Sequence, residues 1–138
     1  MKFTKTSEYA IRVLTYITSH NDREYFSVNY LHKTLNIPYK YLGQLMHEMT
    51  QAGFVVSSMG KKGGYKISPS KDSIYLFEII KAIEGLEKFN QCILGLPGCS
   101  ERNPCSVHKY WKEFREQIIK MLHDISIEKL AEDSNIKY

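Results

Sequence analysis

The sequence contains little cysteine and no long hydrophobic run, and each absence excludes a class of protein. Three of the 138 residues are Cys. This number is odd, and a cytosolic chain keeps its thiols reduced, so a disulfide scaffold is excluded. No apolar run approaches the roughly 20 residues that a membrane span needs, and the first eight residues lack the apolar stretch of a signal peptide. We therefore expect a cytoplasmic protein with no membrane partner.

The residue patterns of an active site are also missing. No general acid–base pair and no nucleophile spaced from a base stands out. The Gly-rich stretch 60–64 lacks the Lys-Ser or Lys-Thr ending of a nucleotide-binding phosphate loop. We therefore expect no enzyme activity and no small-molecule substrate. The chain is 43% hydrophobic and 25% charged, which is ordinary for one globular domain of this length.

The charges are distributed unevenly along the chain. Residues 1–71 carry a net charge of +6, whereas residues 72–138 carry −2. A basic first half is typical of the electrostatic footprint of a DNA-binding protein. An uneven surface with no partner would give the same numbers, so charge alone does not decide the function.

Three amphipathic segments in the first half predict a helix-turn-helix. Residues 36–38, Asn-Ile-Pro, predict a tight turn between the second and third of them. Thr6 and Ser27 are the expected N-caps of the first two helices. Two short helices joined by a brief turn are typical of a helix-turn-helix. The helices are predicted from apolar residues at helical spacing, over residues 6–20, 27–35 and 39–52.

The third predicted helix offers a polar face that suits the major groove of DNA. Lys, Gln and His side chains can donate to or accept from base edges there. An ordinary solvated face has the same composition, so the helix taken alone leaves both interpretations open. The candidate DNA-contacting residues of the helix-turn-helix are Ser27, Tyr39, Lys40, Gln44 and His47.

A β-hairpin is predicted directly after this helix. The β-prone segments 54–56 and 65–67 flank a Gly-rich turn that contains Lys61 and Lys62. A hairpin in this position is the wing of a winged helix-turn-helix. We expect Lys61 and Lys62 at its tip to contact phosphates or the minor groove.

A long apolar seam is predicted near the C-terminus. A helix over residues 74–85 is followed by an irregular segment, and Asn103-Pro104 predicts the start of a long helix. Apolar residues then recur alternately four and three positions apart, as in an a/d seam. We expect this seam to be a dimer interface, because symmetric dimers match two-fold related DNA half-sites. Its residues are Val107, Trp111, Phe114, Ile118, Met121 and Ile125.

The three cysteines, Cys92, Cys99 and Cys105, follow the pattern C-x6-C-x5-C in a segment rich in Gly and Pro. Cys105 is expected in the first turn of the long helix, where the dipole favours a thiolate, with His108 on the same face. Structural zinc prefers C-x2–4-C pairs and redox enzymes prefer C-x-x-C, and neither is present. An iron–sulfur cluster tolerates longer spacing and a non-Cys ligand. A cluster is therefore favoured, with zinc and purely structural cysteines as the alternatives.

Four segments together carry a more specific pattern. They are residues 5–12 (KTSEYAIR), residues 51–55 (QAGFV), the turn 60–65 (GKKGGY) and the three-Cys loop. In order and spacing they resemble the Rrf2 family of bacterial transcription regulators. The resemblance implies a dimeric winged-helix regulator, in most members a repressor, whose cluster state alters its DNA affinity. It also implies that the three Cys residues are the cluster thiolates.

The resemblance implies two candidates for the fourth cluster ligand. His108 matches the position that supplies it in one branch of the family, and Glu8 of the partner subunit matches a carboxylate used in another. The choice between a 2Fe–2S and a 4Fe–4S cluster stays open with the ligand. Gly43 stands where relatives often carry a larger polar residue, and Met59 where Arg is common. The operator sequence of a relative therefore cannot be transferred.

These observations predict a mainly α fold with a small β-hairpin, as one compact domain. Residues 1–85 are expected to form a winged helix-turn-helix DNA-binding region, 86–105 the cluster-binding loop, and 106–138 the dimerisation helix and tail. The predicted function is a homodimeric repressor that binds double-stranded DNA with two-fold related half-sites and senses redox state, nitric oxide or iron–sulfur supply. The alternatives are a zinc-stabilised or cluster-free winged-helix regulator, and a metal-bearing redox protein with no DNA role.

Overall fold

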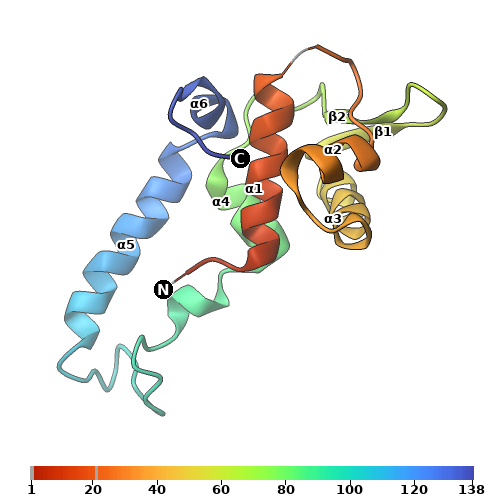
Figure 1. Cartoon of the computed structure of the whole chain (residues 1–138). Coiled ribbons are helices and arrows are strands. Elements are labelled where there is room, and N and C mark those ends of the chain that lie inside the picture. The colour runs from red at the N-terminus through yellow and green to blue at the C-terminus, as the bar shows by residue number, and fades with distance from the viewer. Residues whose placement is uncertain (1, 21) are drawn as a thin grey trace.

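The computed structural model describes residues 2–20 and 22–138. It confirms a mainly α fold with a small β-hairpin (Figure 1). The elements in chain order are α1 (Lys5–Ser19), α2 (Val28–Leu35), α3 (Tyr39–Gln51), β1 (Val55–Ser58), β2 (Gly64–Ile67), α4 (Leu76–Ile83), the 3-10 helix η1 (Glu87–Asn90), α5 (His108–Asp124) and α6 (Ile127–Glu132).

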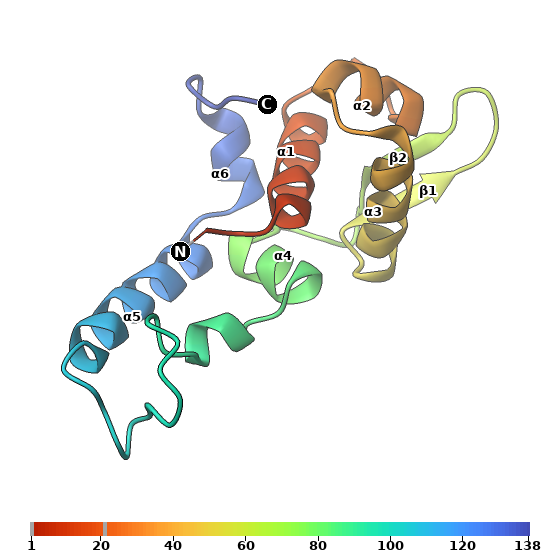
Figure 2. The ribbon, with the colours of Figure 1, turned by 60° about the horizontal axis from the view of Figure 1, so that its bottom comes forward.

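Helix α1 runs through the centre of the main core. Figure 2 shows it between α6 on one side and α2 and α3 on the other, and α4 and β2 also pack against it. Its buried apolar stripe is the one that helical spacing predicts. The stripe consists of Ala10, Val13, Leu14 and Ile17.

The first helix begins earlier than the sequence suggests. Thr4, not Thr6, is the N-cap, and its hydroxyl accepts a hydrogen bond from the Ser7 backbone N–H at 3.2 Å. The prediction of Thr6 as the cap was therefore wrong. The Thr6 hydroxyl instead hydrogen-bonds to the hydroxyl of Tyr41 on α3. This contact joins the first helix to the predicted recognition helix.

The turn between α2 and α3 forms as predicted. Asn36 has a left-handed backbone conformation with φ of 55°, which Asn tolerates better than most residues. The next residue, Ile37, is fully buried, and its carbonyl oxygen lies 2.6 Å from Nδ1 of His32. Arg12 of α1 donates to the last carbonyl oxygen of α2 at 2.7 Å. The direction of α3 is therefore fixed by both preceding helices.

The hairpin follows α3 directly and occupies the wing position. Its strands pair antiparallel, with Ser58 opposite Gly64 near the turn. The chain just before α2 adds a third partner, because Phe26 and Tyr65 exchange backbone hydrogen bonds of 2.8 and 2.9 Å. The wing is thus attached to the helix-turn-helix through the backbone.

Two glycines in this region differ in their surroundings. Gly64 has a φ of 141°, and a Cβ there would lie 2.4 Å from the Phe26 carbonyl oxygen. The close approach of wing and helix-turn-helix therefore needs glycine at this position. Gly43, in the middle of α3, has nothing within 4 Å of the place where a Cβ would be. Packing within the chain does not require glycine at position 43.

Substitution by Ala should shift stability in opposite directions at these two glycines. Gly43→Ala is expected to raise the free energy of unfolding by about 1 kcal/mol, because Ala is a better helix former than Gly. Gly64→Ala is expected to lower it by more than about 1 kcal/mol, because its Cβ would collide with backbone atoms. Urea denaturation measures both values. A stabilised Gly64→Ala variant would contradict the attachment of the wing.

Helices α4 and α5 and the 3-10 helix η1 enclose a second, smaller core. Ile80 of α4, Phe89 of η1 and Leu122 of α5 are buried together there. Helix α5 stops before Ile125, whose carbonyl oxygen accepts a hydrogen bond of 3.0 Å from the Leu76 backbone N–H. The chain then enters α6, which returns to pack on α1 (Figure 1). Sequence periodicity did not predict α6 as a helix separate from the long helix.

The long helix also begins later than predicted. It starts at His108, so the expected N-cap at Asn103 was wrong. Asn103 and Ser100 instead exchange backbone hydrogen bonds of 3.1 and 3.3 Å, which close a tight turn. Cys105 therefore precedes α5, and its predicted place in the first helical turn was wrong as well.

The predicted apolar seam is divided between two environments. Trp111 is 6% exposed and Ile118 packs against the smaller core, so both face the interior of this chain. Val107 and Ile125 are the two caps of α5 and do not belong to the helix itself. The predicted seam, from Val107 to Ile125, therefore cannot be a dimer interface along its whole length.

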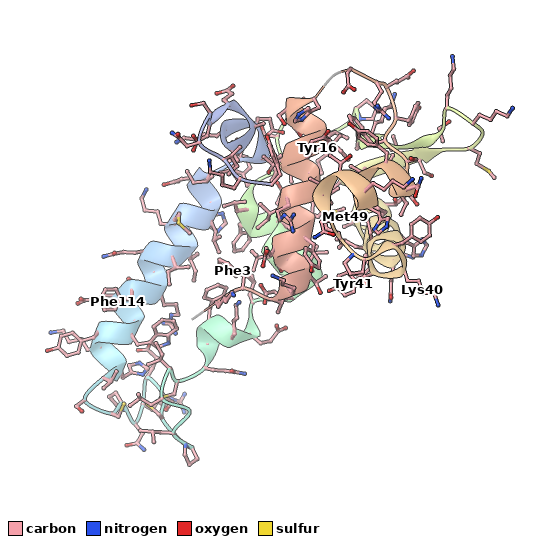
Figure 3. The ribbon with its side chains drawn as sticks, in the orientation of Figure 1. Phe3, Tyr16, Lys40, Tyr41, Met49 and Phe114 are labelled. Atoms are coloured by element: carbon pink, nitrogen blue, oxygen red, sulfur yellow. The ribbon has the colours of Figure 1, made fainter. Side chains whose placement is uncertain are left out.

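The rest of the seam lies on a free face of α5. Phe114 and Met121 are 60% and 46% exposed, and Tyr110, one helical turn before Phe114, is 64% exposed. Figure 3 shows Phe114 on α5, apart from the body formed by α1, α2 and α3. Three large apolar side chains on one stripe are unusual for a surface that only water covers.

In the described part of the chain, every helix is too short or too polar to cross a lipid bilayer.

Candidate nucleic-acid interface and metal centre

The outward face of α3 carries the four side chains that are predicted to read DNA there. Tyr39, Lys40, Gln44 and His47 are all exposed, whereas the apolar face of the helix is buried in the main core. In Figure 3, Lys40 lies at the outer end of α3, on the side of the molecule away from α5. The helix can therefore approach a partner with this face unobstructed by the rest of the described chain.

The wing and the start of α2 form a hollow beside this helix. Its volume is about 390 Å³, and it is lined by Arg23, Glu24, Tyr25, Ser27, Lys61, Lys62 and Gly63. Ser27 is also the N-cap of α2, as predicted, and accepts a hydrogen bond of 3.1 Å from a backbone N–H. The structure thus gathers three of the predicted DNA-contacting residues and leaves the four of α3 outside this hollow.

Arg23 is a further cation in this hollow, and no sequence pattern predicted it there. Its guanidinium carbon lies 3.7 Å from the centroid of the Tyr30 ring, and its Nε lies 3.5 Å from Asp22. Stacking on the ring holds the guanidinium near Lys61 and Lys62. The three cations of the hollow outnumber its one carboxylate, Glu24, and this excess of positive charge suits a phosphate group. Arg23 lies in a polar segment without periodicity, so local sequence patterns give no signal for it.

The loop between η1 and α5 brings the three cysteines together. Their sulfur atoms all lie within 4.8 Å of one another, and each residue is half-buried. Gly95 and Gly98 have φ values of 70° and 76°, which let the loop fold back on itself. A metal could be bound by the side chains of Cys, His, Asp or Glu. Among the described residues, the three that bring their ligand atoms this close together are these cysteines.

The loop backbone favours a negative charge on Cys92. The backbone N–H of Leu96 lowers the pKa of the Cys92 thiol most, and the N–H groups of Leu94 and Gly95 and the Cys99 thiol also lower it, against partial burial. Backbone N–H groups that converge on one sulfur stabilise a thiolate. Cys92 is therefore prepared to act as a metal ligand.

Cys99 lies at the centre of the triad and behaves differently. The backbone N–H of Cys105 lowers the Cys99 pKa, but desolvation and the neighbouring thiols of Cys105 and Cys92 outweigh it, so that the pKa is raised. Three thiolates this close repel one another unless a cation lies between them. A bound metal would supply that positive charge and hold all three in the thiolate form.

His108 approaches the thiols from the first turn of α5. Its Nδ1 lies 3.8 Å from the Cys99 sulfur, and its Nε2 lies 3.6 Å from Oε1 of Glu101. Nε2 is inaccessible to solvent and has no hydrogen-bond partner among the described residues. A cavity of about 450 Å³ opens here, lined by Cys92, Cys99, His108 and the Trp111 ring among others.

Glu8 lies away from the thiols of its own chain. It belongs to the first turn of α1 and pairs with Lys5 at 3.0 Å, and this hydrogen bond lowers the Glu8 pKa. Its carboxylate, like the His108 imidazole, is outside the group of ligand atoms that lie within 4.8 Å of one another, and unlike the imidazole it has no hydrogen bond to a Cys sulfur in the described part of the chain. A role at the cysteines therefore requires Glu8 of the partner subunit.

The donor set fits a metal that prefers sulfur. Three thiolates and one imidazole nitrogen are ligands that both iron–sulfur clusters and zinc accept. The sulfurs come from a loop and not from a helix or strand, so their spacing can adjust to the group that they bind. The residues present therefore fit an iron–sulfur cluster, and they fit a single zinc ion too.

Three comparisons place these features among known proteins. An HTH-type transcriptional regulator of Aquifex aeolicus (strain VF5) is 35% identical over 120 residues, which cover 86% of this chain and 83% of the relative. The regulator IscR of Xenorhabdus nematophila is 26% identical over 136 residues, covering 99% and 82%. Among solved structures, CymR, the global cysteine regulator of B. subtilis, superposes with a TM-score of 0.79 at 23% identity, covering 95% of this chain and 96% of that chain.

A family model matches the chain from residue 3 to residue 133, and its description is an iron-dependent transcriptional regulator named Rrf2. The match includes the helix-turn-helix, the wing, the cysteine loop and α5. Both sequence relatives are named as HTH-type transcriptional regulators. This protein therefore belongs to the Rrf2 family of transcriptional regulators.

Proposed function

We propose that this chain is a homodimeric, DNA-binding repressor of the cytoplasm whose DNA affinity is controlled by an iron–sulfur cluster. The observation that carries the proposal is the loop that gathers three thiols within 4.8 Å, on a chain with a winged helix-turn-helix. Three thiolates and one weaker ligand make a labile site. The proposed signal is therefore redox state, nitric oxide or iron–sulfur supply.

Cys92, Cys99 and Cys105 would hold the cluster, with His108 or Glu8 of the partner subunit as the fourth ligand. The position of His108 Nδ1, 3.8 Å from the Cys99 sulfur, favours the imidazole within this chain. When bound, the cluster supplies iron that reacts with oxygen and nitric oxide. Either a 2Fe–2S or a 4Fe–4S form is compatible with this set of ligands.

DNA recognition is proposed to divide between α3 and the wing. Tyr39, Lys40, Gln44 and His47 would contact base edges in the major groove. Lys61 and Lys62, together with Arg23, would contact the flanking phosphates or the minor groove. Gly43 lies on α3 with open space around it, which lets the backbone of this helix come close to DNA.

The exposed stripe on α5 is proposed as the centre of the homodimer interface. Phe114→Glu is expected to weaken the dimer by about 2 kcal/mol or more, because a large apolar anchor is replaced by a charge. Lys109→Gln, which changes the net charge equally at another position of α5, should leave the dimer intact. Sedimentation equilibrium measures both. A Phe114→Glu protein that dimerises like the unmodified chain would place the interface elsewhere.

Contacts within the chain connect the cysteine loop to this interface. The Trp111 Nε1–H of α5 donates to the Gln91 carbonyl oxygen at 3.0 Å, directly before Cys92. Arg115 donates to the Phe89 carbonyl oxygen at 3.0 Å. Rearrangement of the loop would therefore move α5, and with it the spacing of the two α3 helices in a dimer. This is the proposed link between the cluster and DNA affinity.

A zinc-stabilised regulator is the second candidate, because three thiols this close together can also bind one zinc ion. Tetrahedral zinc with bonds of about 2.3 Å to sulfur places its sulfurs about 3.8 Å apart. The observed limit of 4.8 Å exceeds that value by about 1 Å, so the loop would have to close slightly around the ion. In this case the wing and α3 would keep their DNA role, and the proposed signal would be lost.

The deciding experiment is iron, sulfide and zinc analysis of anaerobically purified protein, followed by DNA binding before and after a pulse of nitric oxide or oxygen. Matched iron and sulfide, with a visible spectrum that changes together with DNA affinity, is the expected result. Colourless protein that contains zinc would support the second candidate. A coloured protein that fails to bind duplex DNA at moderate salt would instead indicate a redox protein without a DNA role.

A further inference from the structure

We propose that Glu101 is a positioning residue, which turns the His108 ring so that Nδ1 faces the Cys99 thiol. The inference rests on the proposed function, because it concerns His108 as a cluster ligand. Glu101 lies between Cys99 and Cys105, and no sequence pattern singled it out.

The geometry around His108 carries the inference. The two ring nitrogens face different groups, with Nδ1 3.8 Å from the Cys99 sulfur and Nε2 3.6 Å from Oε1 of Glu101. Nε2 is shielded from solvent and makes no hydrogen bond among the described residues, and the Glu101 carboxylate that faces it lies just beyond hydrogen-bond distance. A small shift of the ring or the loop would let Nε2 donate to the Glu101 carboxylate, which would leave the lone pair of Nδ1 free for a metal.

Glu101 also pairs with two cations of α5, and because its side chain is 60% exposed each of these ion pairs contributes little. Its Oε2 lies 3.4 Å from Nζ of Lys112, and its Oε1 lies 3.8 Å from Arg115. His108, Lys112 and Arg115 follow one another by one helical turn on one side of α5. The carboxylate of the loop thus meets a row of three nitrogen groups.

Glu101 connects the imidazole of His108 to the loop that carries the three thiols. Histidines that bind a metal commonly donate their other ring N–H to a carboxylate, which fixes the ring and makes it a better ligand. Here that carboxylate lies on the same loop as the three thiols. Movement of the loop would therefore release the imidazole and the sulfurs together. Loss of one ligand would promote loss of the others.

The test measures how fast an iron chelator removes iron from the cluster-loaded full chain. Removal is expected to be about 10-fold to 100-fold faster in Glu101→Ala than in the unmodified protein, as for other outer-shell partners of metal ligands. Lys112→Ala, which removes another partner of Glu101 and leaves His108 untouched, should change the rate little. In a His108→Ala protein, the additional substitution Glu101→Ala should not increase the rate of iron removal further, because the two residues would act as one unit.

A spectroscopic measurement follows the imidazole directly. With 15N-labelled histidine, pulsed EPR of the reduced cluster should show a nitrogen coupling in the unmodified protein and in Lys112→Ala. The coupling should be weakened or lost in Glu101→Ala and absent in His108→Ala. Circular dichroism and thermal unfolding measure whether each variant is folded. If Glu101→Ala does not fold, Glu101→Gln, which keeps the shape of the side chain, replaces it.

The outcomes separate this inference from the proposed function. If the unmodified chain takes up no cluster, both are overturned. If it holds a cluster without a histidine coupling, or loses iron at the same rate with and without Glu101, only the positioning role is overturned. A Glu101→Ala effect that persists in the His108→Ala background would make Glu101 a tether of the loop only, and would also overturn it.

Discussion

Cys99→Ala is expected to abolish metal retention, which is the largest single effect that the structure implies. Cys99 is the central thiol: it contacts the thiols of both other cysteines and lies 3.8 Å from Nδ1 of His108. Replacement of an outer partner of a metal ligand typically costs 10-fold to 100-fold in affinity, so removal of a ligand should cost more than about 100-fold. Iron and sulfide analysis of anaerobically purified protein measures the loss.

Ser106→Ala is the matched control, because it lies in the same loop, is exposed and offers no thiol. It should retain as much iron as the unmodified protein. The DNA affinity of Cys99→Ala should no longer respond to nitric oxide or oxygen, whereas Ser106→Ala should respond normally. Full iron content in Cys99→Ala would contradict the proposed ligand set. If the unmodified chain contained a full equivalent of zinc and Cys99→Ala lost it, the three thiols would form a structural zinc site and not a cluster site.

The features that sequence predicted best are those that local chemistry determines. Asn36 tolerates a left-handed backbone and Pro38 precedes a helix readily, so the turn before α3 needs no distant contact. The wing follows from two β-prone segments around a Gly-rich turn. In the cysteine loop, glycines at positive φ allow the thiols to meet, as the composition of the loop predicts. Each of these signals lies within a few residues of the element that it specifies.

The features that sequence missed depend on contacts between distant segments. Asn103-Pro104 has the local signature of a helix start, but the turn that Asn103 closes with Ser100 delays the helix. The spacing of the apolar seam could not show that Trp111 is covered by this chain's own loop, where it donates to Gln91. Helical periodicity identifies an apolar face but not what covers it. The same reason explains why part of the predicted interface lies inside the chain.

In the candidate site, too, the features within one segment were predicted and those that join distant segments were not. The cysteine spacing identified the three thiols, because all of them lie in one loop. The contact of His108 with Glu101, across seven residues, depends on how that loop meets α5, and no periodicity describes it. Arg23 is placed beside the wing by its stacking on Tyr30 and by the pairing of Phe26 with Tyr65. Both contacts join segments that lie apart in the sequence, so the phosphate hollow was only partly predicted.

The wing lysines should account for a large share of the DNA affinity. The double substitution Lys61→Ala and Lys62→Ala is expected to lower affinity for any duplex on the order of 10-fold to 100-fold at 0.1 M salt, because two phosphate contacts and their released counterions are lost. The slope of log affinity against log salt should fall by about 2, since each contact contributes about 0.9. Fluorescence anisotropy over a series of salt concentrations measures both quantities.

The salt series also distinguishes the two roles proposed for these lysines. Phosphate contacts carry no sequence information, so the preference for a duplex selected from a random pool over an unselected duplex should stay nearly constant. A falling preference would instead indicate that the lysines contact bases in the minor groove. Lys81→Ala with Lys129→Ala, at exposed positions on α4 and α6, removes the same charge outside the hollow and serves as the control. If both double variants changed the slope equally, overall charge and not the wing would explain the binding. An unchanged slope in the wing variant would place the DNA contact elsewhere on the surface.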